Sequence, residues 1–377
     1  MKMGRFVFDG HIHPGKKDHA SADSKINGVH SMVEEADNSN LILLDMDAYS
    51  VDMGLILPSM IGTTNELHAE IVKKHPDRFR SMCVDCKTRL AAATGEKEWN
   101  IDDAIKELDS VLAWGPEIMV GIGEIAPGSL GCPRERPTRE QRFKEWCAIA
   151  ELATHYDVPV YFHDYCQFNL EDPFTMIASV LQKYPGFKVI IAHGGGQRKE
   201  DIERASILAG LYEGVYLETG YWRAEYYEIP LRNYEVGASK LLWGGGDTGS
   251  RIWYPQATQP GLKYTAPTRI WFNRNNWALG NRELGYQPDY YGWSTHQISK
   301  LKDMEICTQD EINLILGGNA ARLYKLKLDP AYTFCYNRPD LNIPDRETLE
   351  TNGASWRTGF VNPAGQDFIA GEQSYYL

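Results

Sequence analysis

The sequence has no long apolar run, no excess of basic charge and no signal-peptide pattern. No stretch approaches the roughly 18 to 20 apolar residues that a membrane helix needs, and Met1-Lys-Met-Gly4 leads straight into a strand-like segment. The formal net charge of −12 argues against binding nucleic acid or an anionic membrane through a basic face. We therefore expect a cytoplasmic protein that acts on a small molecule.

Cysteine patterns offer no disulfide framework and no obvious redox site. The seven cysteines are an odd, scattered set, which is typical of a reduced cytoplasmic protein. Cys83 and Cys86 have CxxC spacing, but they lie in an extended-looking segment where positions i and i+3 face opposite sides. A structural role is favoured for both. Internal repeats and low-complexity tracts are also absent.

Short apolar runs alternate with amphipathic segments along most of the chain. Eight strand-like runs cover 5–13, 52–59, 78–86, 118–126, 159–164, 188–195, 215–221 and 240–247. Helical patterns cover 64–75, 101–113, 138–157, 173–184, 198–212 and 225–237, and a closing helix covers 308–324. Alternation of strand and helix implies parallel pairing, and eight such units predict an α/β fold of the (β/α)8 TIM-barrel type.

The pattern changes after the eighth run. Residues 248–305 form an insertion rich in Trp and Tyr amid Asn, Gly and Pro. This insertion could wall a substrate pocket, or it could lie in the contact of a homodimer or higher oligomer, where aromatic residues are enriched. We expect residues 1–326 to form one catalytic barrel that includes the insertion. Residues 327–377 are expected to form a C-terminal extension that wraps the surface.

Side chains that can bind metals recur where the predicted strands end. In a TIM barrel the carboxyl ends of the strands share one pocket, although they are far apart in sequence. The candidate ligands are His11, His13, Glu124, His163, His193 and Asp247. His11 and His13, at positions i and i+2 of one strand, point to the same face.

Each candidate also has an ordinary structural explanation. A histidine at the end of an apolar strand is often a hydrogen-bonded core residue, and Asp247 before Thr248 and Gly249 could be a turn aspartate. The structural explanation, however, requires six such coincidences on five strands of one barrel. Imidazole and carboxylate donors without cysteine favour a divalent ion, most simply zinc, with manganese, iron or cobalt as alternatives.

Several motifs resemble those of the amidohydrolase superfamily, in particular its amidohydrolase-related (amidohydrolase 2) branch. That branch includes aminocarboxymuconate-semialdehyde decarboxylase and aromatic-acid decarboxylases. The matching segments are Phe8-Asp-Gly-His-Ile-His13, Tyr161-Phe-His-Asp164, Ile191-Ala-His-Gly-Gly195, Trp243-Gly-Gly-Gly-Asp247 and Ile315-Leu-Gly-Gly-Asn-Ala-Ala-Arg-Leu-Tyr324. The resemblance covers residues 5–325 and implies a metal-dependent enzyme.

The resemblance does not decide whether each chain binds one metal ion or two. In decarboxylase-like members, the residues matching His11, His13, His163 and Asp247 hold one ion, and His193 would be an acid or base beside it. Glu124 departs from that pattern. It resembles the carboxylate of TatD-type hydrolases, which bridges two ions, with His163 and His193 on the second.

Two reactions follow from these alternatives. We expect a hydrolase that uses metal-activated water, with Asp247 and His193 as catalytic residues, and a non-oxidative decarboxylase of an aromatic or enoic acid is the alternative. Arg251 is the candidate to bind a substrate carboxylate, and Trp222 and Trp253 are candidates to flank a planar substrate. A non-catalytic barrel would be expected to have lost at least one metal ligand. All six candidate ligands are present, so this alternative is disfavoured. A metal-free lactone hydrolase remains a further alternative.

Overall fold

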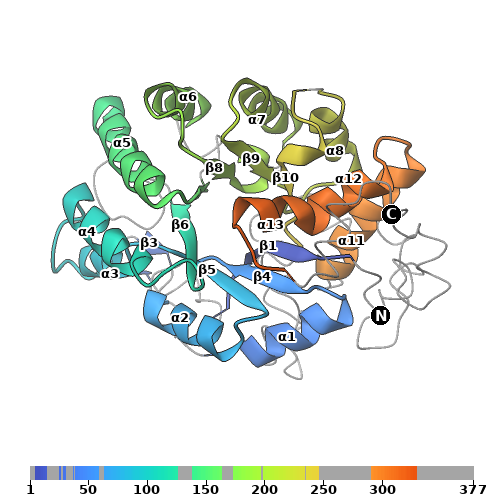
Figure 1. Ribbon diagram of the computed structural model, residues 1–377. Helices are drawn as coiled ribbons and strands as arrows, with labels where there is room; N and C mark the ends of the chain where they lie inside the picture. The colour runs from blue at the N-terminus through green and yellow to red at the C-terminus, as the bar shows by residue number, and fades with distance from the viewer. Residues whose placement is uncertain are drawn as a thin grey trace.

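Eight parallel strands form one sheet that curls into a barrel surrounded by helices in the computed structural model (Figure 1). The structure describes residues 5–14, 25–26, 29–30, 37, 39–58, 63–125, 138–163, 173–196, 198–233, 235–245 and 290–328. The strands, in both chain and spatial order, are β1 (Phe8–Ile12), β4 (Met53–Ile56), β5 (Phe79–Cys83), β6 (Met119–Ile125), β7 (Val160–Phe162), β8 (Val189–Ile191), β9 (Val215–Glu218) and β10 (Leu241–Leu242). Each lies within a predicted run, so the TIM-barrel prediction is confirmed. A two-stranded hairpin, β2 (Lys25–Ile26) and β3 (Val29–His30), lies outside this sheet.

One backbone hydrogen bond between β1 and the residue that follows β10 nearly closes the barrel. The backbone N–H of Gly10 donates to the carbonyl of Trp243 over 2.8 Å. A Cβ at position 10 would lie 3.0 Å from that carbonyl oxygen, tighter than most Cβ contacts. Glycine therefore lets β1 approach the segment that follows β10.

The predicted helices form; five have ends shifted by one residue at most, and the one predicted at 225–237 ends six residues early, at Leu231. They are α2 (Asn65–Lys74), α4 (Ile101–Leu112), α5 (Arg139–Tyr156), α6 (Pro173–Lys183), α7 (Lys199–Leu211) and α8 (Ala224–Leu231). The Thr138 hydroxyl accepts the N–H of Gln141 over 3.1 Å and so caps α5. Three helices were not predicted: α1 (Ser39–Ala48), α3 (Cys86–Ala93) and α11 (Tyr290–Asp303). β5 ends at Cys83 and Cys86 begins α3, so the expectation that both cysteines lie in one extended segment is wrong.

The predicted closing helix forms in three consecutive parts. They are α12 (Gln309–Asn313), a π-helical turn (Leu314–Gly318) and α13 (Asn319–Leu323). The Asn319 amide donates to the carbonyls of Ala238 and Leu241 over 2.7 and 2.8 Å. The Ile315 carbonyl accepts the N–H of Trp243 over 3.1 Å. This helical segment therefore holds the short strand β10 in place.

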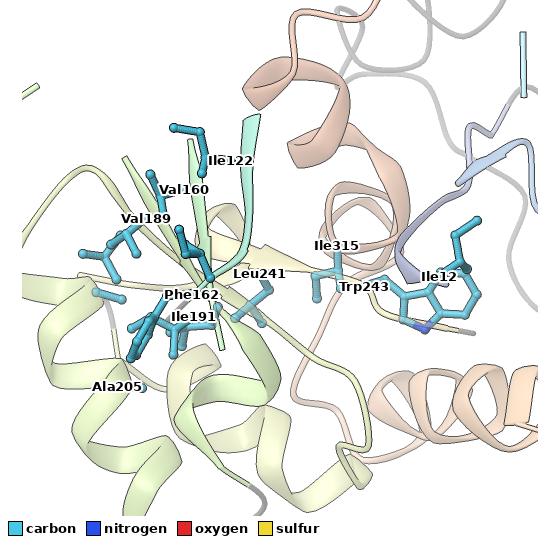
Figure 2. Packing of buried hydrophobic residues seen from close by; sticks show 14 of the residues in the cluster. Ile12, Ile122, Val160, Phe162, Val189, Ile191, Ala205, Leu241, Trp243 and Ile315 are labelled. Atoms are coloured by element: carbon cyan, nitrogen blue, oxygen red, sulfur yellow. The ribbon is translucent and has the colours of Figure 1, made fainter. Parts of the chain in front are cut away.

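Two apolar cores arise from the alternation of side chains along the strands. The outer core lies between strands and helices; Figure 2 shows Val160, Phe162, Val189 and Ile191 there, with Ala205 of α7. The inner core fills the barrel and is formed by residues such as Tyr161, Ile190 and Leu242. Ala320, Leu323 and Tyr324 of the closing segment belong to this inner core. The inner core leaves the carboxyl ends of the strands as the place for a site.

Parts of two predicted segments lie outside the described residues. These are positions 246–289, which include most of the insertion, and positions 329–377 of the C-terminal extension. Within the described part of the chain, no helix combines the length and the apolar character needed to cross a bilayer.

Candidate metal centre

His11 and His13 point their imidazoles at one position beyond the end of β1. Their Nε2 atoms are 3.1 Å apart, and both side chains are buried. The Nδ1 atom of His13 lies 2.6 Å from the carbonyl oxygen of Leu57, so it carries the proton and donates it. His13 therefore presents the lone pair of Nε2 toward His11.

Glu124, on β6, faces both of these histidines and a third. Its Oε1 lies 3.2 Å from the Nε2 of His11 and 3.9 Å from the Nε2 of His163, while its Oε2 lies 3.8 Å from the Nε2 of His13. Burial alone raises the pKa of this carboxyl, but the charges of His163 and His11 hold the pKa of Glu124 below its usual range. Among the described residues, its Oε1 has no hydrogen-bond donor in good geometry.

His193 follows β8 in an unusual backbone conformation that its neighbours stabilise. Its φ is +52°, in the left-handed region that residues other than glycine rarely adopt. Its N–H donates to Glu218 Oε2 over 2.8 Å, and its carbonyl accepts the indole N–H of Trp222 over 2.9 Å. The ring stacks on His11 at 4.8 Å between centroids and meets His163 edge-on at 5.3 Å.

Glu218, at the end of β9, is a central residue that was not predicted. Its Oε2 lies 3.3 Å from His11 Nδ1 and 3.2 Å from His193 Nδ1, and the side chain is fully buried. Burial raises the pKa of Glu218, but His193 and His11 outweigh that effect and lower the pKa to about 2. The rule that selects the candidate ligands, the first metal-competent side chain at a strand end, also applies to Glu218 in run 215–221.

Asp9 connects the backbone of His11 to distant parts of the chain. Its Oδ1 accepts the N–H groups of His11 and Gly245 over 3.0 and 2.8 Å, and its Oδ2 accepts the Tyr291 hydroxyl over 2.6 Å. Burial raises the pKa of Asp9 to about 7. The Tyr161 hydroxyl, which also was not predicted, lies 3.0 Å from His11 Nδ1.

The structure places the predicted site residues as follows. Five of the six candidate ligands lie together: His11, His13, Glu124, His163 and His193. Asp247, Arg251 and Trp253 lie outside the described residues. Trp222 is buried against the carbonyl of His193, where it supports the backbone of that residue. Its role in substrate binding stays a prediction.

The donor set fits one or more divalent cations. Three groups have ligand atoms within 4.8 Å of one another: His11, His13 and Glu124; Glu124, His163 and His193; and His11, His193 and Glu218. Nitrogen and carboxylate oxygen donors suit zinc and related ions. The close approach of two imidazole Nε2 atoms to one carboxylate brings electron-rich atoms together, and a cation between them would relieve their repulsion.

Comparisons with known proteins agree with this fold. A family model described as Amidohydrolase matches residues 9–326. An uncharacterised TIM-barrel protein from Bordetella bronchiseptica is 16% identical, with a TM-score of 0.50 over 85% of this chain and 98% of that one. A candidate amidohydrolase from Staphylococcus aureus is 14% identical, with a TM-score of 0.51 over 85% and 99% of the two chains.

A third similar structure was solved with metal. This amidohydrolase from Burkholderia multivorans contains bound zinc and is 10% identical, with a TM-score of 0.52 over 85% of this chain and 99% of that one. At such low identities, the likeness of these solved structures establishes the barrel fold. No curated protein matches the sequence.

Proposed function

Because this chain belongs to the amidohydrolase family, we propose that it is a metal-dependent hydrolase with two metal positions. Its substrate would be a small molecule that is aromatic or bears a carboxylate. When bound, divalent ions supply Lewis acidity, which makes water a nucleophile near neutral pH and polarises a scissile carbonyl. The chain's own residues orient the site, bind the substrate and move protons.

The position of Glu124 carries this proposal. It is the member common to two of the groups of potential ligands, one with His11 and His13 and the other with His163 and His193. Its two carboxylate oxygens face different histidines. A carboxylate between two sets of imidazoles is suited to bridging two ions, and two-metal sites are common in hydrolytic enzymes.

Protein side chains would perform the remaining steps. Asp247 would accept a proton from the attacking water and return it to the leaving group. Arg251 would bind a substrate carboxylate through its planar fork, with Trp222 and Trp253 near an aromatic substrate. The homo-oligomeric state and the cytoplasmic location that we expect from the sequence are further predictions.

Metal stoichiometry tests the bridge. We would count metal ions per chain by elemental mass spectrometry, after purification without chelator, for the wild type, Glu124→Gln and Glu151→Gln. Glu151 lies on the exposed side of α5 and serves as the matched control. We expect two zinc ions per chain in the wild type and in Glu151→Gln, and a value near one in Glu124→Gln.

One ion per chain, unchanged by Glu124→Gln, would contradict the bridge and favour the decarboxylase. A parallel assay of carbon dioxide release from aromatic and enoic acids, against hydrolysis of esters, lactones and amides, then identifies the reaction class.

Replacing the proposed proton carrier tests the mechanism. Asp247→Asn should lower kcat by at least about 100-fold, the range typical of general acid–base catalysis. Thermal unfolding should stay close to that of the wild type. Full activity in this variant would remove Asp247 from the mechanism.

A further inference from the structure

Glu218 lies in a space that neighbouring glycines leave open for it. A Cβ at Gly244 would lie 1.6 Å from Glu218 Oε1, and a Cβ at Gly220 would lie 2.6 Å from the same atom. The N–H of Gly220 also donates to this oxygen. Any larger residue at either position would displace the carboxylate, so its orientation is fixed by the surrounding backbone.

The other oxygen of Glu218 faces two histidines at once. The rings of His11 and His193 are stacked, with 21° between their planes, and the Nδ1 atoms of both lie within 3.3 Å of Glu218 Oε2. A carboxylate accepts hydrogen bonds and does not donate them when ionised. The hydrogen bond with His11 and the close charge contact with His193 therefore each favour a proton on Nδ1, which leaves each Nε2 as an electron-pair donor.

The orientation of the His11 ring agrees with a proton on its Nδ1 atom. Its Nδ1 edge faces Glu218, while its Nε2 lies 3.1 Å from His13 Nε2 and 3.2 Å from Glu124 Oε1. His193 reaches the same region, because it shares one group of potential ligands with Glu124 and His163. His11 therefore lies between two carboxylates, with Glu218 behind the ring and Glu124 on the metal-facing side.

We propose that Glu218 is a positioning residue that orients His11 and His193 together and fixes both as Nδ1–H tautomers. Through this single oxygen atom, it would set the orientation and basicity of His11 at one metal position and of His193 at the other. This inference rests on the proposed two-metal function. Outer carboxylates of this kind fix ligand orientation and raise ligand basicity. Glu218 would also hold the left-handed backbone of His193 through its N–H.

Nuclear magnetic resonance of metal-free protein tests the tautomers directly. Protein labelled with ¹⁵N at histidine gives long-range ¹H–¹⁵N correlations that distinguish Nδ1–H from Nε2–H rings. Signals are assigned with His11→Gln and His193→Gln. We expect both rings in the Nδ1–H form in the wild type and loss of that preference in Glu218→Gln. An Nε2–H form of either ring in the wild type overturns the proposal, even if the variant fails to fold.

Zinc affinity, measured by competition with a chelator, provides the second readout. Glu218→Gln should weaken zinc binding about 10- to 100-fold. Two controls accompany it. Glu145→Gln replaces a buried glutamate on α5 that accepts a hydrogen bond from Gln141, and it should leave zinc affinity unchanged. Tyr161→Phe removes the hydroxyl near His11 Nδ1 and should leave the His193 tautomer unchanged.

The outcomes separate this inference from the proposed function. A zinc affinity of Glu218→Gln within twofold of the wild type overturns the positioning role. Both readouts are obtained without substrate, so a lack of hydrolysis overturns the proposed reaction and leaves the role of Glu218 supported.

Discussion

At the scale of single residues, the centre depends on close packing around its carboxylates. Glu218 is enclosed by the backbone of Gly220 and Gly244, while Gly194 lies against the indole of Trp222. A Cβ at Gly194 would lie 2.4 Å from that ring, and its φ of +63° also favours glycine. Glycines near the candidate metal centre therefore leave room for the Glu218 carboxylate and the Trp222 ring.

Gly244→Ala should be strongly unfavourable because its methyl group would overlap the Glu218 carboxylate. We expect a loss of about 1–3 kcal/mol in the free energy of unfolding, as for other overpacked sites, together with weaker zinc binding. Gly186→Ala is the control, since its Cβ would meet only Thr154 at 3.6 Å. Denaturant unfolding compares the two, and equal stability of both variants would contradict this packing.

The rule that metal-competent side chains end barrel strands predicts residues that the structure brings together, whereas residues that act through distant pairing cannot be found in this way. His11, His13, Glu124, His163 and His193 end apolar runs, and the structure brings them together. Glu218 ends the strand within run 215–221 in the same way, but it is not among the predicted site residues. Asp9 could not be predicted, because its partners Gly245 and Tyr291 are 236 and 282 residues away, and nothing local indicates such pairs.

At the scale of elements, the short strand β10 depends on the helical segment that follows the insertion. The Asn319 amide binds the carbonyls of Ala238 and Leu241, which flank and begin this strand. Asn319 is fully buried, so loss of its N–H donors would leave these carbonyl groups without that partner. The position of the eighth strand end therefore depends on one side chain of the closing segment.

Asn319→Asp should destabilise the protein by about 2–4 kcal/mol, since a carboxylate would face two carbonyl oxygens in a buried place. Asn233→Asp is the matched control. The Asn233 side-chain oxygen accepts the N–H of Glu235 over 3.1 Å, and aspartate keeps that acceptor. Thermal unfolding of both variants measures the difference, and a small effect at position 319 would argue against its anchoring role.

Elements with a strong periodic pattern could be predicted, and those stabilised by distant contacts could not. The eight strands and six outer helices follow from alternating apolar runs, and Thr138 and Pro173 indicate two helix starts. By contrast, α11 contains Tyr291, which binds Asp9, and Ser294, which accepts the indole N–H of Trp243. These tertiary contacts, rather than amphipathic periodicity, hold α11 in place.

At the scale of the whole molecule, ion pairs connect the end of the closing segment to the amino-terminal ends of the strands. Lys325 and Lys188 both pair with Asp157, which ends α5, and Lys327 pairs with Glu117, which precedes β6. These groups lie at the face opposite the strand carboxyl ends. In TIM barrels that lower face serves stability while the upper face serves chemistry.

Asp157→Asn tests the contribution of this face to stability. Hydrogen bonds from Lys188 and Lys325 lower the pKa of Asp157, so its stabilising effect exists above the unfolded pKa of about 3.9 and is lost as pH falls through the lower folded value. Asp157 is 56% exposed, so solvent screening limits the effect to roughly 0.2–1 kcal/mol. Asparagine also tolerates the left-handed φ of 54° at this position.

Urea unfolding from neutral to acidic pH provides the measurement. The variant should be less stable than the wild type at neutral pH, and the two curves should converge at the acidic end. A difference that persists in acid would show that the substitution acts through the backbone and not through charge.

The contacts of Asp9 can form only late in translation. A ribosome that has made β1 must still add Gly245, 236 residues later, and Tyr291, 282 residues later, before Asp9 has these partners. His11 and His13 thus emerge first, while the groups that fix their strand emerge near the end of synthesis. A nascent chain consequently contains these two candidate ligands long before the complete candidate centre can form. Under the proposed function, the complete set of candidate ligands is therefore assembled only after nearly the whole barrel has been translated.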